Sequence, residues 1–282
     1  LNMVGGQDEL IFDGTSFVMN SRGEITYRAP SFEEKIEIIE FNVSAKEKEP
    51  LSANVTPRLN DEESVYKALV KGTRDYINKH KFPGVVLGLS GGIDSALTLA
   101  IACDAIGNEN VRAVMMPYTY TSAMSLEDAE LQSSILNIQY DILPIETLYD
   151  ASMELLKPIF DGKNVDTTEE NIQSRARGIL LMAISNKTGL MLLTTGNKSE
   201  MAVGYATLYG DMAGGYAPLG DLYKMEVYAL AREFNKRLGA NAVNESTMTK
   251  PPSAELAPGQ KDEDSLPPYP VLDEILCLHI EG

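Results

Sequence analysis

Short runs of apolar residues alternate with amphipathic segments over most of the chain. Four apolar runs predict buried strands, at residues 85–89, 112–116, 140–143 and 190–194. Segments with helical spacing of apolar residues separate these runs. Short buried strands that alternate with helices are typical of a parallel sheet covered by helices on both faces. The predicted fold class is therefore α/β, with a doubly wound parallel sheet.

Capping residues predict where some of the helices begin. Asp61 precedes an amphipathic segment that we expect to be helical. Ser125 is followed three residues later by Asp128, and Thr167 is followed at the same offset by Glu170, as in a capping box. We therefore expect further helices to begin at Ser125 and Thr167, the second of them ending near residue 186.

The first sixty residues lack this alternation. Two extended runs, at residues 10–12 and 24–28, are separated by turn-forming residues and predict a hairpin. Residues 44–60 are polar, contain proline and show no periodicity, which indicates a linker. We predict a small β region at residues 1–43, a linker at 44–60 and the main domain at 61–282.

Composition narrows the classes of partner. The net charge of −17 argues against a general nucleic-acid binder, which needs a basic face for the phosphates. The apolar runs are much shorter than the roughly 20 residues that span a bilayer. The two cysteines and two histidines show no metal-ligand spacing and no disulfide framework. We expect a cytoplasmic protein with neither a membrane nor a nucleic-acid partner.

The strongest local motif is Ser-Gly-Gly-Ile-Asp-Ser at residues 90–95, between a predicted strand and a predicted helix. Gly91 and Gly92 lack a Cβ, so the backbone can approach a ligand closely. The first-turn amides of the helix point outward at the positive end of its dipole, and Ser90 and Ser95 add hydroxyl donors. A cradle for phosphate is the functional interpretation, and a tight turn that packs a helix on a strand is the structural alternative.

Asp94 favours the functional interpretation. A carboxylate beside a phosphate cradle repels the ligand unless a cation lies between them, so Asp94 is a candidate Mg²⁺ ligand. The motif is neither a Walker loop nor a dinucleotide fingerprint. It resembles the pyrophosphate loop of the PP-loop ATP pyrophosphatases, which form an adenylate from ATP and release pyrophosphate.

A second motif indicates which member of that class the chain resembles. Thr-Thr-Gly-Asn-Lys-Ser-Glu at residues 194–200 is similar to the T-x-G-N-x-S-E motif of NAD⁺ synthetases. Residues 170–177, 204–211, 218–224 and 250–256 together with 262–269 resemble further family segments in the family order. A solvated helix charge is the alternative for Glu200, and ordinary surface ion pairing is the alternative for Arg175 and the one we favour for Arg177.

The resemblance implies a set of site residues. Those implied to contact ATP are Gly88, Leu89, Ser90, Gly91, Gly92, Asp94, Ser95, Thr195, Lys224 and Ser253. Those implied to contact deamido-NAD⁺ are Asn171, Arg175, Glu200, Tyr205, Thr207 and Lys261. Asp94 and Glu200 are the implied Mg²⁺ ligands, and Asp94, Glu200, Lys224 and Asp262 are the implied catalytic residues. Because the helix dipole opposes a lysine at a helix start, the position of Lys224 also favours function.

The N-terminal residues carry a separate resemblance. Residues 2–14 are similar to the closing strands of the nitrilase-like glutaminase domain that precedes the synthetase in glutamine-dependent members. Neither Cys103 nor Cys277 fits the role of the nucleophile of that glutaminase domain. We therefore expect this chain to use ammonia rather than glutamine as nitrogen donor. Both ends read as cut, which predicts a C-terminally incomplete synthetase domain after a glutaminase remnant. The resemblance also implies a homodimer or higher homo-oligomer.

The resemblance implies a ligase that uses ATP and Mg²⁺ to convert deamido-NAD⁺ and ammonia into NAD⁺, AMP and pyrophosphate. Two alternatives stay open. A tRNA-thiolating PP-loop enzyme needs a basic RNA face and usually paired cysteines, neither of which the sequence shows. A nucleotide sensor without chemistry needs no Glu200 opposite Asp94.

Overall fold

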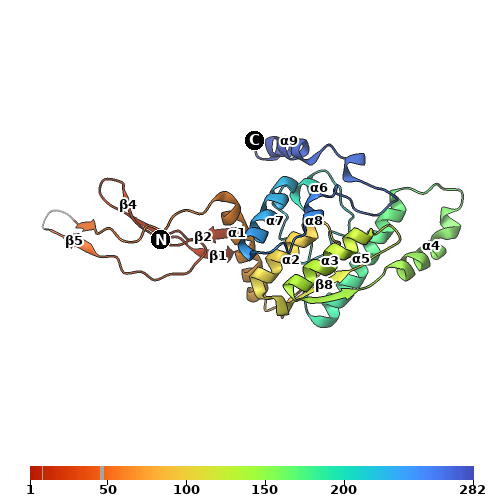
Figure 1. The fold of residues 1–282 in the computed structure, drawn as a ribbon, viewed down its shortest axis with the longest axis horizontal. Helices are drawn as coiled ribbons and strands as arrows, with labels where there is room; N and C mark the ends of the chain where they lie inside the picture. The colour runs from red at the N-terminus through yellow and green to blue at the C-terminus, as the bar shows by residue number, and fades with distance from the viewer. Residues whose placement is uncertain (8, 45–47) are drawn as a thin grey trace. The chain divides into compact units, whose positions relative to one another are not determined.

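The computed structural model describes residues 1–7, 9–44 and 48–282, and it divides the chain into two compact units, Leu1–Lys79 and His80–Gly282 (Figure 1). Each unit is described by itself. Residue 8, within the glutaminase-like motif, and residues 45–47 of the predicted linker lie outside the described residues.

Three antiparallel strand pairs form the β part of the first unit. They are β1 (Val4–Gln7) with β2 (Leu10–Asp13), β3 (Phe17–Met19) with β4 (Ile25–Arg28), and β5 (Phe41–Val43) with β6 (Lys48–Pro50). The predicted pairing of run 10–12 with run 24–28 is wrong, because each run pairs with a nearer strand. The turn at residues 20–23 joins β4 to β3, whose Phe17 and Val18 also favour extended backbone.

Helix α1 (Asp61–Lys79) packs on the β1–β2 hairpin within the same unit. The Gly6 amide donates to Asp75 Oδ2 at 2.8 Å, and Lys71 Nζ pairs with Asp75 Oδ1 at 3.0 Å. This compact unit therefore includes α1, whereas the predicted main domain begins at residue 61. Strand β6 lies within the predicted linker.

The second unit contains a parallel sheet with strand order β10-β7-β8-β9. Its strands are β7 (Val85–Gly88), β8 (Val111–Met115), β9 (Gln139–Ile142) and β10 (Met191–Leu193), which confirms the four predicted strands. From β7 the chain builds outward through β8 and β9 and then returns to the other side of β7 as β10. The order therefore reverses between β7 and β10, and open α/β sheets bind ligands at such a point.

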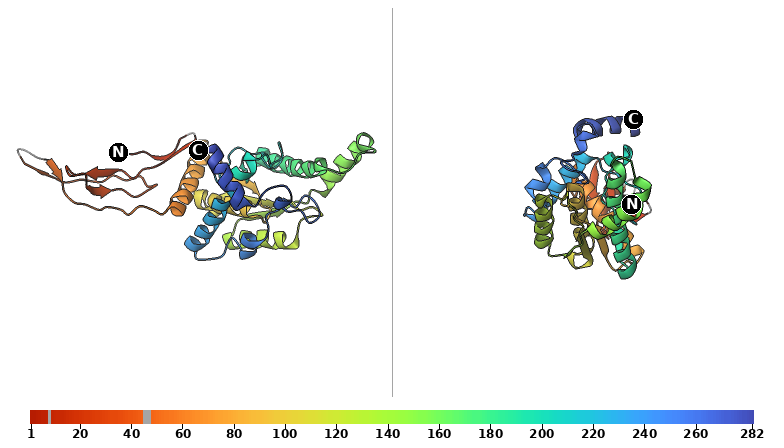
Figure 2. Two further views of the ribbon diagram at one scale, coloured as in Figure 1. Left: turned by 90° about the horizontal axis from the view of Figure 1, so that it is seen from above. Right: turned by 90° about the vertical axis from the view of Figure 1, so that its right-hand side faces the viewer.

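Helices cover both faces of this sheet. Helices α2 (Ile93–Ile106) and α3 (Ala123–Leu136) pack on one face, and α5 (Thr167–Thr188) lies on the opposite face, as the end-on view in Figure 2 shows. Val86, Val114 and Leu192 pack with Ala176 and Leu181 of α5 in one apolar cluster. The α/β doubly wound prediction is confirmed.

The second unit contains further helices around this core. They are η1 (Asn108–Asn110), α4 (Glu146–Phe160), α6 (Lys198–Ala202), α7 (Lys224–Leu238), α8 (Glu245–Thr249), η2 (Asp262–Asp264) and α9 (Tyr269–Ile280). Of these, α7 packs on α2. Helix α4 was not predicted; it contains Pro158 and has no fully buried residue. Within the described ranges, no helix is both long enough and apolar enough to cross a membrane.

All three predicted capping residues are wrong in position. Helix α1 is capped by Asn60, whose Oδ1 accepts from the Glu63 amide at 2.8 Å, and Asp61 is the first residue of the helix. Helix α3 is capped by Ser122, whose Oγ accepts from the Ser125 amide at 3.1 Å, and α5 is capped by Asp166. Ser125 and Asp128 instead bind residues far along the chain. Asp166 takes the cap of α5 because its carboxylate is a stronger acceptor than the neighbouring threonine hydroxyl.

Candidate active site

A cavity of about 500 Å³ opens at the carboxyl ends of β7 and β10. Its wall brings together most of the predicted site residues: Gly88, Leu89, Ser90, Gly92, Asp94, Ser95, Asn171, Thr195, Glu200, Tyr205, Thr207, Lys224, Ser253 and Asp262. Gly91, Arg175 and Lys261 are not among the lining residues. The site is thus assembled at the reversal of strand order.

The loop after β7 is held by its own hydroxyls. Ser90 Oγ lies 3.2 Å from Ser95 Oγ, which donates to the Gly92 carbonyl at 3.0 Å. Gly91 has a φ of +78°, and a Cβ there would lie 2.3 Å from the Ser125 carbonyl oxygen. Gly92 is the N-cap of α2 in ordinary extended backbone and supplies no side-chain cap. The first-turn amides of α2 are therefore left to bind a ligand.

Beside this loop, Lys224 lies between two carboxylates. Its Nζ is 2.6 Å from Asp94 Oδ2 and 2.9 Å from Glu200 Oε1. Asp94 follows β7, Glu200 lies in α6 after β10, and Lys224 is the first residue of α7. Asn197 Nδ2 also donates to Asp94 Oδ1 at 2.8 Å. The three charged groups form what we call the acid–lysine cluster (Asp94, Glu200, Lys224).

Burial governs the electrostatics of this cluster. Burial and the nearby charge of Asp94 raise the pKa of Glu200 to about 7, against the attraction of Lys224. Burial alone lowers the pKa of Lys224, but the charges of Asp94 and Glu200 outweigh it and hold that pKa well above its usual value. Lys224, whose side chain is 3% exposed, is therefore a permanently charged ammonium at the cavity wall.

Asp262 adds a third carboxylate, bound by two tyrosines. Its Oδ1 accepts from Tyr205 Oη at 3.2 Å and its Oδ2 accepts from Tyr269 Oη at 2.8 Å. The ring of Tyr269 lies below Lys224, with the Nζ 5.1 Å from its centroid. Asp262 is thus joined through Tyr269 to the acid–lysine cluster. The pKa of Tyr205 is raised, chiefly by burial and next by the charge of Asp262.

The predicted substrate residues divide into two groups. Thr207 Oγ1 donates to Asn171 Oδ1 at 2.8 Å at the cavity wall. Arg175 is exposed and its Nε donates to the Leu208 carbonyl, while Lys261 is exposed on the loop before η2. The structure therefore brings Asn171, Tyr205 and Thr207 together and leaves Arg175 and Lys261 outside the wall.

Arg177 corrects one expectation. We favoured surface ion pairing for it, but it lines the cavity and its Nε donates to the Met116 carbonyl at 3.0 Å. Burial lowers its pKa to about 10, opposed by Glu255, so it stays charged near neutral pH. Helical spacing was the signal that could have found it, since Glu170, Ser174 and Arg177 lie on one face of α5.

Two glycines make a backbone contact in the cavity wall. A Cβ at Gly178 of α5 would lie 2.8 Å from the Tyr209 carbonyl oxygen, and a Cβ at Gly210 would lie 2.8 Å from Ser174 Cβ. No larger residue fits at either position without moving the backbone. We call this contact the glycine seam (Gly178 and Gly210).

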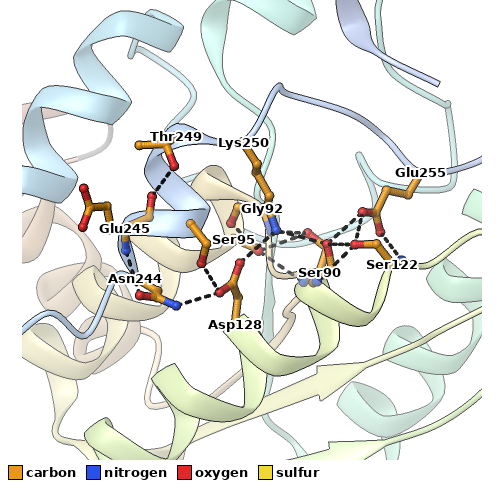
Figure 3. Close-up of polar contacts among 12 residues, drawn as sticks. Ser90, Gly92, Ser95, Ser122, Asp128, Asn244, Glu245, Thr249, Lys250 and Glu255 are labelled. Atoms are coloured by element: carbon orange, nitrogen blue, oxygen red, sulfur yellow. Dashed lines mark hydrogen bonds and ion pairs between the residues drawn. The ribbon is translucent and has the colours of Figure 1, made fainter. Parts of the chain in front are cut away.

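Residues 250–262 form a strap along the cavity, anchored at one end on α3 (Figure 3). Glu255 accepts from Ser122 Oγ and Ser125 Oγ, each at 2.8 Å, and Lys250 Nζ pairs with Asp128 at 3.1 Å. At its other end Gln260 Nε2 donates to Glu170 of α5 at 2.9 Å. The strap thus joins helices from the two faces of the sheet.

Ser253, a predicted ATP contact, serves the internal structure of the strap. Its Oγ donates to the Gln260 carbonyl at 2.6 Å and accepts from the Glu255 amide at 3.0 Å. Thr195 lies half-buried at the cavity wall. Both residues remain accessible to a ligand in the cavity.

The donor set suits Mg²⁺. Asp94 and Glu200 both bind the Lys224 ammonium, so the two carboxylates lie close enough together to share a cation beside the loop at residues 90–95, which we call the phosphate loop. Mg²⁺ is usually held by one or two carboxylates together with substrate phosphates and waters. Over the described residues, no group of three or more His, Cys, Asp or Glu side chains forms a metal site by itself. Phosphate oxygens would therefore have to complete the coordination.

Comparison with known proteins gives one consistent family. A family model described as NAD synthase matches residues 65–282. The glutamine-dependent NAD(+) synthetase of Acinetobacter baylyi is 52% identical over 281 residues, which are 100% of this chain and 52% of that protein. That of Thermotoga maritima is 46% identical, over 99% of this chain and 54% of that protein. The chain spans about half the length of these curated relatives.

Solved structures agree. The glutamine-dependent NAD⁺ synthetase of Acinetobacter baumannii, in complex with ADP, has a TM-score of 0.85 and 50% identity, over 99% of this chain and 50% of that one. An NMN synthetase from Francisella tularensis has a TM-score of 0.69 and 28% identity, over 77% of this chain and 86% of that one. The fold, the order of the motifs and the family match all agree, and the chain belongs to the NAD synthase family.

Proposed function

We propose that these residues carry the synthetase activity of a glutamine-dependent NAD⁺ synthetase, a ligase that forms NAD⁺, AMP and pyrophosphate from deamido-NAD⁺, ATP and ammonia. The family match and the relatives' names support the general reaction. The observation that carries the proposal is Lys224 between Asp94 and Glu200, beside a phosphate loop at the reversal of strand order. This arrangement suits the departure of a pyrophosphate group.

The phosphate loop would hold the ATP phosphates. Ser90, Ser95 and the first amides of α2 offer donors at the positive end of the α2 dipole. Lys224 adds a fixed positive charge that need not reorganise as charge develops on the leaving pyrophosphate. Asp94 and Glu200 would hold Mg²⁺, which neutralises phosphate charge when it is bound.

The deamido-NAD⁺ would lie along α5 and the segment after α6. Asn171, Tyr205 and Thr207 line this side of the cavity, and the charged Arg177 can attract an anionic group of the substrate. The nicotinate carboxylate oxygen then bonds to the α-phosphorus of ATP while the bond to pyrophosphate breaks. Ammonia attacks the resulting acyl-adenylate carbonyl, the bond to AMP breaks, and the nitrogen releases one proton to solvent as the amide forms.

The nitrogen source follows from what the described residues offer. Burial raises the pKa of the Cys103 thiol to about 12, so this residue is no nucleophile at neutral pH. Cys277 is exposed, and neither cysteine lines the cavity. We therefore assign glutamine hydrolysis to a glutaminase region of a longer protein, as the relatives' names and lengths suggest. We also infer a homo-oligomer, as the resemblance to the family implies.

Pyrophosphate release tests the proposal. The chain is incubated with ATP, Mg²⁺, ammonium and deamido-NAD⁺, and pyrophosphate and NAD⁺ are quantified together. We expect equal amounts of both, and none when deamido-NAD⁺ is omitted. ATP binding without either product would favour a nucleotide sensor instead.

Two parallel reactions sharpen the test. Glutamine replaces ammonium in the first, with free ammonia removed, and we expect no NAD⁺. Nicotinate mononucleotide replaces deamido-NAD⁺ in the second, because one solved relative is an NMN synthetase. Faster amidation of the mononucleotide would reassign the substrate while leaving the reaction class intact.

A further inference from the structure

Helix α9 is fastened to the two elements that carry Glu200 and Lys224. Asp273 of α9 is 7% exposed. Its Oδ1 accepts from Ser199 Oγ at 2.6 Å, and its Oδ2 accepts from the Met225 amide at 2.8 Å. A single buried carboxylate therefore ties together α6, in which Ser199 precedes Glu200, and the first turn of α7.

The hydrogen bonds continue to the lysine itself. Ser199 Oγ, oriented by its donation to Asp273, accepts from the Lys224 amide at 2.9 Å. Ser199 is fully buried, so water does not compete for these partners. Ser199 and Asp273 consequently fix the positions of Lys224 and Glu200 relative to each other. Neither Ser199 nor Asp273 lines the cavity.

A second set of contacts holds the same two elements. Glu281 Oε1 accepts from Lys198 Nζ at 2.6 Å and from Tyr223 Oη at 3.0 Å. Tyr223 also packs with Tyr269, Leu272 and Leu276 of α9 in an apolar cluster. Helix α9 thus contacts the residues directly before Ser199 and Lys224. Its outer residues, such as Glu274, are exposed.

We propose that Asp273 is a positioning residue, which acts through Ser199 to hold Lys224 and Glu200 at the separation that the adenylation step requires. The proposal rests on the proposed function. An error of about 1 Å in the placement of catalytic groups can cost on the order of a hundredfold in rate. The phosphate loop makes none of these bonds, so Asp273 should affect the adenylation step much more than nucleotide binding.

The test compares Asp273→Asn with Glu274→Gln, the loss of an adjacent exposed charge on the same helix. We expect kcat for pyrophosphate release to fall about ten- to a hundredfold in Asp273→Asn, with the KM for ATP within about twofold of the original, and no change in Glu274→Gln. Ser199→Ala should show the same split. Because both act through one path, the double variant should be hardly slower than the worse single variant. An unchanged kcat, or a KM that rises as much as kcat falls, would overturn the proposal.

A second readout needs no turnover. Surface lysines are labelled with an amine-reactive reagent, and the modification of Lys224 is followed by mass spectrometry. We expect Lys224 to react faster in Asp273→Asn than in the parent, with Glu274→Gln unchanged. If the parent chain releases no pyrophosphate, the proposed function fails and the labelling still decides the role of Asp273. Should Asp273→Asn fail to fold, Ser199→Ala carries both measurements, and unaltered Lys224 labelling in that variant sinks the idea.

Discussion

The phosphate loop and the acid–lysine cluster lie side by side in one cavity, but they are built in different ways. The hydroxyl contacts of the loop join residues at most five positions apart, from Ser90 to Ser95. The ion pairs of the cluster join Lys224 to Glu200, 24 positions away, and to Asp94, 130 positions away. The loop is a local structure, whereas the cluster exists only when the sheet, α6 and α7 have packed.

This difference implies a division of labour. The loop needs only β7, α2 and the neighbouring α3, on which Gly91 packs, so its affinity for phosphate should depend little on the later part of the chain. The geometry of the cluster depends on α9 and on the strap, both of which come late in the chain. Damage to the loop should therefore appear in nucleotide affinity, and damage to the cluster should appear in stability and turnover.

The largest effect is expected from Lys224→Met. Removing the ammonium leaves Asp94 and Glu200 facing each other without compensation, which typically costs about 3–5 kcal/mol in the free energy of unfolding. Chemical denaturation measures this loss. Lys236→Met is the matched control, because its ion pair with Glu233 is solvent-exposed on the lysine side and should cost less than about 1 kcal/mol. Equal losses in the two variants would contradict the account of the cluster.

Next in size is Glu200→Gln. The loop still holds the nucleotide, but one metal-binding charge is lost as pyrophosphate charge develops. Turnover should therefore fall about a hundredfold, the usual cost of one such electrostatic contact. Calorimetry for ATP affinity and single-turnover adenylate formation separate the two quantities. A variant that loses ATP affinity but keeps its turnover would show that Glu200 does not act on the reaction.

Gly91→Ala tests the loop side of the comparison. A Cβ at this position would lie 2.3 Å from the Ser125 carbonyl oxygen, on a backbone with a φ of +78°. The resulting strain is of order 1–3 kcal/mol. ATP affinity should fall about tenfold, with turnover at saturating ATP less affected. Gly239→Ala is the control, since Gly239 has a similar φ of +69° with open space around it, at the end of α7. It should lower stability and leave ATP affinity unchanged.

The smallest effect concerns pH. Because burial and Asp94 raise the pKa of Glu200 to about 7, this carboxyl takes up a proton as the pH falls from 8 to 6 and ceases to be a good Mg²⁺ ligand. The Mg²⁺ affinity of the ATP-bound chain should therefore weaken by up to about tenfold per unit below pH 7. Glu200→Gln is the control, because protonation of ATP itself affects the parent chain and this variant alike. The difference between the two therefore measures the contribution of Glu200. If the Mg²⁺ affinity of that variant depends equally steeply on pH, Glu200 is not a ligand of the metal.

Features that depend on neighbours in sequence were predictable. All four strands of the parallel sheet were located to within a residue or so, because each is a short apolar run between helical segments. The place of residues 90–95 between a strand and a helix was also predicted correctly, while their binding of phosphate stays a prediction. The capping residues and the pairing of the N-terminal strands were less accurate, since several residues nearby could serve equally well.

Features that depend on long-range packing could not be derived from patterning. Asp273 is an acid in an amphipathic helix, and nothing local shows that its partners are Ser199 and Met225. Asp262 entered only through family resemblance, whereas Lys224 also had a local signal in its place at a helix start. Arg177 lay within reach of the sequence, because its helical spacing from Ser174 places it on the cavity face of α5.

The glycine seam has a consequence for redesign of this cavity. Where Gly178 meets the carbonyl of Tyr209, the wall is made of main chain, and main chain cannot be retuned by exchanging side chains. A directed-evolution library that varied Gly178 or Gly210 would mostly return unfolded clones. A change in ligand selectivity must instead be sought at neighbouring side chains of the cavity wall such as Asn171 and Thr207, so only part of the wall is free to vary.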